Sequence, residues 1–258
     1  MEIREWAIAI LSATDIDSKL LQPKELTDNE PGPPLRWDTP SRPPGMEFHK
    51  RPSGQKLPPF HEHKEADKRA ICLHRFAGHE LLAVELIAFA LLAFPEAPVN
   101  LRKGLAHALK EEQEHVALYI ERMGVFGLQF GDLPLFKHFW AHTPHVHDIL
   151  SFISMMNLTF EQANLDFAPM YGTSFLRYGD EESAALMGKI LSDEIRHVQL
   201  GWRWLQRLKH PDQSAWDAWI HALPELIGPK RAKGFLVHEE HRRAAGLSDE
   251  WIERIKVS

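Results

Sequence analysis

Apolar residues recur at helical spacing from about residue 67 onward, and this pattern predicts four long helices. Residues three and four positions apart share one face of an α-helix, so a stripe of this period marks the buried side. Pro, Gly and capping residues interrupt the pattern, as they do where helices begin or end. The expected helices cover residues 67–94, 100–123, 144–168 and 180–208, with Pro95, Gly124 and Pro169 as stop or kink positions. No segment shows the alternation of a half-buried strand, so we predict an all-α protein.

Residues outside these helices have a different composition. Ten of the eighteen prolines lie within residues 1–60, and proline removes a backbone donor and favours extended geometry before it. Helix is therefore expected in this arm over Ile3–Leu21 alone, and its large aromatic residues predict that it packs on the domain surface. A crossover over 124–147, with a short helix over 135–142, joins the second and third long helices. The predicted parts are a Pro-rich arm (1–66), a four-helix domain (67–208) and a helical C-terminal extension (209–258) with a last helix over 249–255.

Composition narrows the class of protein. The chain has 258 residues, of which 44% are hydrophobic and 26% charged, with a net charge of −6. Its single cysteine, Cys72, excludes an intramolecular disulfide framework and a multi-cysteine zinc site. The acidic balance argues against a general nucleic-acid binder. The apolar stretch 81–94 is shorter than the roughly 20 residues that span a bilayer, so we expect a cytoplasmic protein without a membrane segment.

Several positions inside the apolar stripes carry acids and histidines. The second helix places Glu112 and His115 in its stripe, and the fourth places Glu194 and His197 there. A buried carboxylate must be neutral, paired or bound to a cation, because burial penalises an isolated charge. These inward-facing residues therefore indicate a metal site.

The spacing of these residues makes the prediction specific. The side chains of a Glu-x-x-His pair share a helix face and can reach one metal cluster. Glu80 precedes Glu112 by nearly the same interval as the one that separates Glu161 from Glu194. Each half of the domain thus supplies a Glu followed by Glu-x-x-His on the next helix, which is the arrangement of a di-iron or di-manganese bundle. The predicted metal ligands are Glu80, Glu112, His115, Glu161, Glu194 and His197, with Glu85 as the alternative to Glu80.

Further acids accompany the ligands in both halves. Glu111 and Asp193 precede the two Glu-x-x-His pairs, and metal-binding histidines commonly donate their second N–H to a carboxylate. We expect Glu111 to hold His197 and Asp193 to hold His115. Glu85 and Asp166 follow the first ligand of their halves at the same spacing. These two are either outer hydrogen-bond partners of the site, paired with Arg196, or members of structural buried salt bridges.

Two positions follow the ligand histidines by one helical turn. Tyr119 follows His115, and Gly201 holds the equivalent place after His197. This spacing resembles that of the radical tyrosine in ribonucleotide reductase small subunits, and the resemblance implies that Tyr119 is a redox candidate. The alternative is an ordinary core tyrosine. The absent side chain at Gly201 either opens a substrate cavity or permits close helix packing.

At these residues the chain resembles the ferritin-like di-iron carboxylate superfamily. The stretch Asp193-Glu194-Ile195-Arg196-His197 is similar to the Asp-Glu-x-Arg-His signature of bacterial multicomponent monooxygenases. The stretch 79–86, His-Glu-Leu-Leu-Ala-Val-Glu-Leu, together with the Pro-rich arm, resembles an uncharacterised bacterial branch near the tRNA-modifying non-haem di-iron hydroxylases. The resemblance implies a ferritin-like four-helix bundle with a long crossover between its second and third helices.

The expected activity is that of a non-haem di-iron oxidoreductase, an oxygen-activating hydroxylase or oxidase. Its cofactors would be two Fe ions, with Mn or a mixed Fe/Mn pair as the alternative. Its partners would be a small-molecule substrate, O2 and an electron-donor protein, with a homodimer left open and RNA disfavoured by the net charge. Three other functions remain open: an iron-handling ferroxidase or store, a manganese catalase-like enzyme, and a non-catalytic metal-binding bundle.

Overall fold

The computed structural model describes residues 1–49 and 56–258, so part of the predicted arm, residues 50–55, lies outside the described residues. The chain is mostly helical, which confirms the all-α prediction. It divides into two compact units, Met1–Thr143 and Pro144–Ser258. This boundary falls inside the segment 67–208 that composition grouped together, and each unit is described by itself below.

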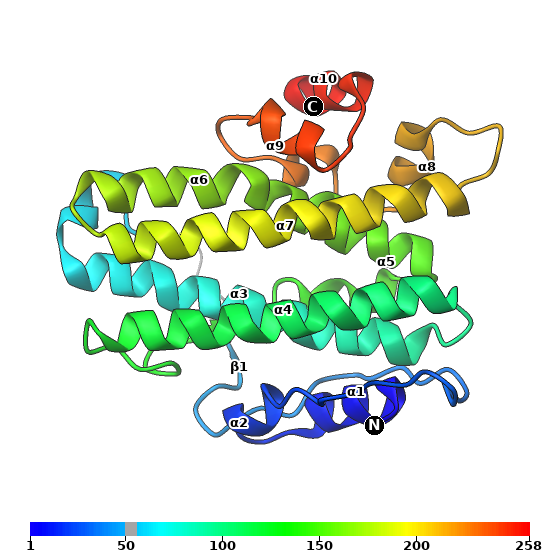
Figure 1. Cartoon of the computed structure of the whole chain (residues 1–258), viewed down its shortest axis with the longest axis horizontal. Coiled ribbons are helices and arrows are strands. Elements are labelled where there is room, and N and C mark those ends of the chain that lie inside the picture. The colour runs from blue at the N-terminus through cyan, green and yellow to red at the C-terminus, as the bar shows by residue number, and fades with distance from the viewer. Residues whose placement is uncertain (50–55) are drawn as a thin grey trace. The chain divides into compact units, whose positions relative to one another are not determined.

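Two long helices form the centre of the first unit. α3 (Ala66–Ala93) and α4 (Val99–Gly124) lie within one residue of the bounds that the apolar pattern predicts. A short connection joins them, and they pack side by side along their length (Figure 1). Helices joined by so short a connection run antiparallel, and this pairing brings the acids of α3 opposite those of α4.

α3 is apolar on nearly every face. In the described part of the chain it is the one helix long and apolar enough to cross a membrane by length and composition. The structure buries 94% of its most apolar 18-residue window. Such burial is typical of the core helix of a soluble protein.

Buried ion pairs fasten the N-terminal arm to this helix pair. α1 (Ile3–Ser12) packs against α3, and α2 (Ile16–Lys19) follows it. The Lys19 Nζ atom lies 2.9 Å from Glu85 Oε1 on α3, and Arg42 pairs with the other oxygen of the same carboxylate. All three side chains are almost completely buried. The arm therefore carries the cations that neutralise Glu85.

The crossover differs from its prediction. The helix expected over 135–142 is wrong: Leu135 and Phe136 form strand β2 (Leu135–Phe136), followed by the 3₁₀ helix η2 (Trp140–His145). β2 pairs in parallel with β1 (Phe48–His49) of the arm, with Phe48 opposite Leu135. This pairing joins segments far apart in the sequence, which a local pattern does not reveal. A further 3₁₀ helix, η1 (Phe60–Lys64), precedes α3.

The third predicted helix, over 144–168, is wrong at both ends. α5 (Ile149–Met155) begins after Asp148, whose side chain accepts a hydrogen bond from the backbone N–H of Ser151. A π-helical segment, η3 (Met156–Glu161), follows, and α6 (Gln162–Arg177) continues through Pro169. Proline has no N–H for the carbonyl one helical turn before it, here that of Leu165. The Leu165 carbonyl instead receives the Nδ1 hydrogen of His241 at 2.9 Å, so the helix passes the proline without an unsatisfied acceptor.

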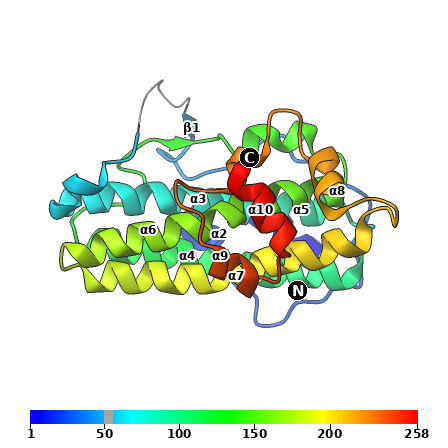
Figure 2. The same cartoon turned by 90° about the horizontal axis from the view of Figure 1, so that it is seen from above.

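The fourth helix and the C-terminal extension complete the second unit. α7 (Glu181–Leu208) has Asp180 as its N-cap, as predicted, and packs side by side with α6 (Figure 2). The extension contains α8 (Ala215–Ala222), the 3₁₀ helix η4 (Pro229–Ala232), α9 (Glu239–Ala244) and α10 (Asp249–Val257). Trp219 and Trp251 lie in its core, with ring centroids 4.8 Å apart. The last helix agrees with the prediction over 249–255.

The arm's ion pairs predict a large loss of stability in Glu85→Gln. Burial lowers the pKa of Lys19 and Glu85 opposes this, so removing the carboxylate leaves two buried basic groups without their anion. We expect the free energy of unfolding, measured by urea denaturation, to fall by about 3–5 kcal/mol. Glu96→Gln, at an exposed position beside the same helix, is the matched control. A loss below about 1 kcal/mol, the range of surface pairs, would contradict the proposed anchor.

Candidate metal centre

Three predicted ligands of the first unit lie together between α3 and α4. Glu80 comes from α3, and Glu112 and His115 come from α4; all three are buried. One possible ligand atom from each lies within 4.8 Å of the others, and His115 Nδ1 is 3.3 Å from Glu112 Oε2. Two carboxylates and an imidazole at this separation can bind one divalent cation.

The second unit contains the corresponding group of three. Glu161, at the end of η3, meets Glu194 and His197 of α7, and all three are buried. The His197 Nδ1 atom lies 3.9 Å from Glu161 Oε1 and 3.7 Å from Glu194 Oε2. We name these two groups the first triad (Glu80, Glu112, His115) and the second triad (Glu161, Glu194, His197).

Two asparagines that the sequence analysis missed hold the carboxylates of the second triad. The Asn157 side-chain amide donates to Glu161 Oε2 at 2.6 Å and to the backbone carbonyl of His197 at 3.2 Å. Asn164 donates to Glu194 Oε1 at 2.8 Å. Each amide engages one oxygen, while the other oxygen of each carboxylate is the one nearer His197 Nδ1. The available signal was the position of these polar residues, about one helical turn before and after Glu161.

The π-helical segment sets the position of Asn157 and Glu161. A π turn shifts the later residues of a helix around its axis, and such turns are frequent at functional sites. The carbonyl of Ser154, just before this segment, accepts hydrogen bonds from Thr159 Oγ1 at 2.8 Å and from Trp219 Nε1 at 3.1 Å. The C-terminal extension, through Trp219, thus supplies a hydrogen-bond donor to a backbone carbonyl beside the π turn.

Gly201 allows α7 to approach this segment closely. A Cβ atom built on Gly201 would lie nearer to the Cβ of Asn157 than real Cβ contacts allow. Of the two alternatives that the sequence left open, the structure therefore supports close helix packing. The missing side chain leaves room for the asparagine that holds Glu161.

Glu85 and Asp166 form structural buried salt bridges, the second alternative for these acids. Asp166 accepts hydrogen bonds from both terminal nitrogens of Arg242, at 2.6 and 2.9 Å. Glu85 pairs with Lys19 and Arg42. The expected pairing with Arg196 is therefore wrong: the arm and the C-terminal extension supply buried cations to these acids, whereas Arg196 is half exposed and pairs with Asp193.

The other predicted neighbours have partners within their own units. Asp193 forms ion pairs with Arg196 and, at 3.0 Å, with Lys189. Glu111 lies 3.5 Å from His107 on α4. Their roles toward the ligand histidines stay predictions, as does the redox role of Tyr119, which is buried with its ring 5.8 Å from that of Phe76.

Cys72 is not part of either triad. The thiol is buried on α3 with its sulfur 3.5 Å from His63 Nε2, and burial raises its pKa to about 12. Among the described residues, the groups of possible metal ligands do not include Cys72. The possible ligand atoms of both triads are carboxylate oxygens and imidazole nitrogens.

The match to a known protein family covers nearly the whole sequence. Residues 7–253 match the family described as "Protein of unknown function (DUF455)". The chain belongs to this family. Over 200 residues it is 29% identical to a relative from Haemophilus influenzae described as "Uncharacterized protein", covering 72% of this chain and 68% of the relative. No solved structure matches.

In this DUF455 protein, the contact between Gly201 and Asn157 predicts opposite effects for two glycines of α7. Gly201→Ala forces Asn157 away, and overpacking of this kind costs about 1–3 kcal/mol. Gly188→Ala, on the same helix, meets nothing within 4 Å and gains roughly 0.5–1 kcal/mol of helix propensity. Thermal and urea unfolding of both variants measure the difference. Equal stability of the two variants would show that this close approach does not constrain the helix pair.

Proposed function

We propose that this DUF455 protein is a non-haem di-iron oxidoreductase with a ferritin-like four-helix bundle, acting as an oxygen-activating hydroxylase or oxidase. One observation carries the proposal: each unit brings two carboxylates and one imidazole, from different helical segments, together in a buried setting. The six residues of the first and second triads would hold two iron ions. Their sharing of one centre rests on the repeated spacing in the sequence, in which a Glu is followed at nearly the same interval by Glu-x-x-His in both halves.

The donor set fits iron or manganese. Oxygen and imidazole ligands suit Fe and Mn, whereas thiolates select softer metals. The triads contain four carboxylates and two imidazoles, so ionised carboxylates and neutral imidazoles would balance the charge of two dications. When bound, a pair of ferrous ions supplies electrons to dioxygen.

The chain's own residues orient the ligands and exclude water. Asn157 and Asn164 each donate to one carboxylate oxygen and so direct the opposite oxygen toward the cation. Leu158, Leu165 and Val198 are fully buried around the second triad's helices and keep their surroundings apolar. A low-dielectric wall strengthens the attraction between the carboxylates and a cation. The substrate would be a small molecule, with electrons delivered by a partner protein.

Metal content and oxygen consumption test the proposal. Protein purified after growth with iron should contain about two Fe per chain, with the magnetic coupling of a shared centre. Glu112→Ala and His197→Ala each remove one ligand and should lose most of the iron and the reductant-dependent oxygen consumption. Glu121→Ala and His210→Ala, at exposed positions, are the matched controls. Circular dichroism establishes that the variants keep their helices.

Other outcomes separate the alternatives. Bound manganese with peroxide disproportionation would favour a catalase-like enzyme, and uptake of excess iron as mineral would favour a ferroxidase or store. Two uncoupled metals would mean that the triads act separately. Protein without Fe or Mn under all loading conditions, with Glu112→Ala and His197→Ala indistinguishable from wild type, would refute metal binding by these residues.

A further inference from the structure

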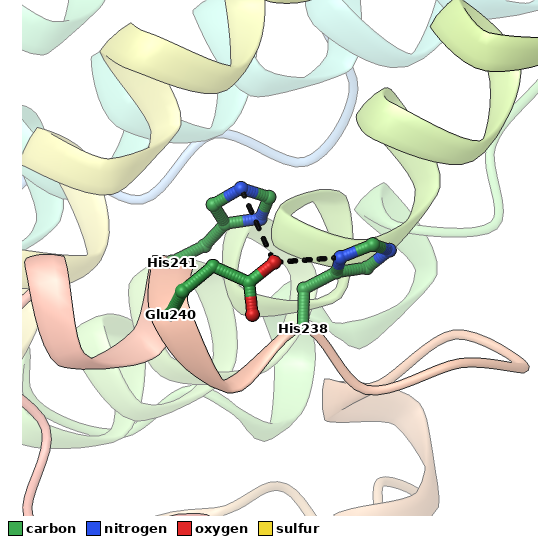
Figure 3. A group of neighbouring side chains, drawn as sticks. All are labelled: His238, Glu240 and His241. Carbon is green, nitrogen blue, oxygen red and sulfur yellow. Dashed lines mark hydrogen bonds and ion pairs between the residues drawn. The ribbon is translucent and has the colours of Figure 1, made fainter.

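A third group of side chains that could hold a metal ion lies outside both triads, at the start of α9. His238, Glu240 and His241 converge there (Figure 3). Glu240 Oε1 lies 3.0 Å from His238 Nδ1 and 3.8 Å from His241 Nε2. The two imidazole side chains are about one-fifth exposed, and the Glu240 side chain is 66% exposed, so the group is open to solvent on the carboxylate side.

The protonation of His241 is fixed by the helix that contains Pro169. The proline frees the Leu165 carbonyl, and an acceptor of this kind requires a hydrogen on His241 Nδ1, 2.9 Å away. In the neutral ring the Nε2 atom then carries a lone pair, and that atom faces Glu240 Oε1. The Nε2 lone pair and the carboxylate oxygen are then two donor atoms that one cation can bind together.

The bonding of His241 is that of a metal-binding histidine. Its Nδ1 atom donates to a backbone carbonyl, and its Nε2 atom faces a carboxylate oxygen. A ring nitrogen that bonds a backbone carbonyl while its other nitrogen meets a ligand is the usual arrangement of a metal-binding histidine. This geometry favours a cation among the three side chains.

A buried anchor holds the group in place. Asp166 accepts hydrogen bonds from the backbone N–H groups of Gly234 and His238, both at 2.8 Å, and from Arg242. A Cβ on Gly234 would lie 2.8 Å from the Asp166 Cβ, so the segment is fitted closely to α6. His238 and α9 are therefore positioned before any cation arrives, which lowers the entropic cost of binding.

We propose that His238, Glu240 and His241 bind one borderline divalent cation of the Zn²⁺ class, independently of the two triads. Two imidazoles and one carboxylate form a common three-ligand set for zinc, and water completes the tetrahedron on the exposed side. Ligands at about 2.0–2.1 Å from a tetrahedral metal lie roughly 3.3 Å apart, which falls between the two separations given above. The cation joins the loop before α9 to α9 itself and, through His241, to α6.

Zinc titration of the metal-stripped full-length protein tests the proposal. Glu240→Gln should lose one equivalent of bound Zn²⁺ in calorimetry relative to wild type. Glu239→Gln removes a neighbouring carboxylate that pairs instead with Arg243 and Lys256, so it should bind zinc as the wild type does. His241→Gln keeps a side-chain donor for Leu165 and should also lose this equivalent.

Locating the zinc ion directly in the wild-type protein makes the test independent of whether a variant loses zinc because it misfolds. In zinc-soaked crystals of the wild-type protein, anomalous scattering at the zinc edge should give a peak among His238, Glu240 and His241. Glu112→Ala should leave this peak unchanged, which separates the site from the proposed iron centre. Equal zinc binding by wild type and Glu240→Gln, or no peak at this position, would overturn the proposal.

Discussion

The burial of carboxylates is the constraint on which most of this structure depends. Glu80, Glu85, Glu112, Glu161 and Asp166 are buried in helices whose other inward residues are apolar. A carboxylate in such surroundings needs a cation or a set of hydrogen bonds, because the interior does not solvate its charge as water does. The described structure meets this need in two ways that recur in both units.

The first way is a basic residue from a terminal segment. Lys19 and Arg42 of the arm neutralise Glu85, and Arg242 of the C-terminal extension neutralises Asp166. Each of these acids follows a predicted ligand on the same stretch of helix. The arm and the extension thus provide the cations that pair with these two acids. The second way is a triad in which two carboxylates lie beside a histidine. The oxygen and nitrogen atoms of such a triad are suitable ligands for a metal cation.

The sequence predicted those elements that local patterns determine. The bounds of α3, α4 and α7 follow from apolar period and capping residues, and the two triads follow from residue type and spacing. Features that depend on distant contacts did not follow. The pairing of β1 with β2 joins the arm to the crossover, segments that are separated in the sequence by both α3 and α4. The cations of Glu85 and Asp166 come from segments whose position no periodicity reveals, and Asn157 acts through a π turn that has no sequence signature.

The hydrogen bond between His241 and the Leu165 carbonyl, one turn before Pro169, shows how one long-range contact affects both a helix and a side chain far from it in the sequence. The sequence marked Pro169 as the end or a kink of a helix, since proline removes a backbone donor. The Nδ1 hydrogen of His241 replaces that donor, and α6 therefore extends to Arg177. The same hydrogen bond determines which nitrogen of His241 faces Glu240. A local defect in one helix thereby fixes the tautomer of a side chain in the C-terminal extension and gives the start of α9 the geometry of a cation ligand.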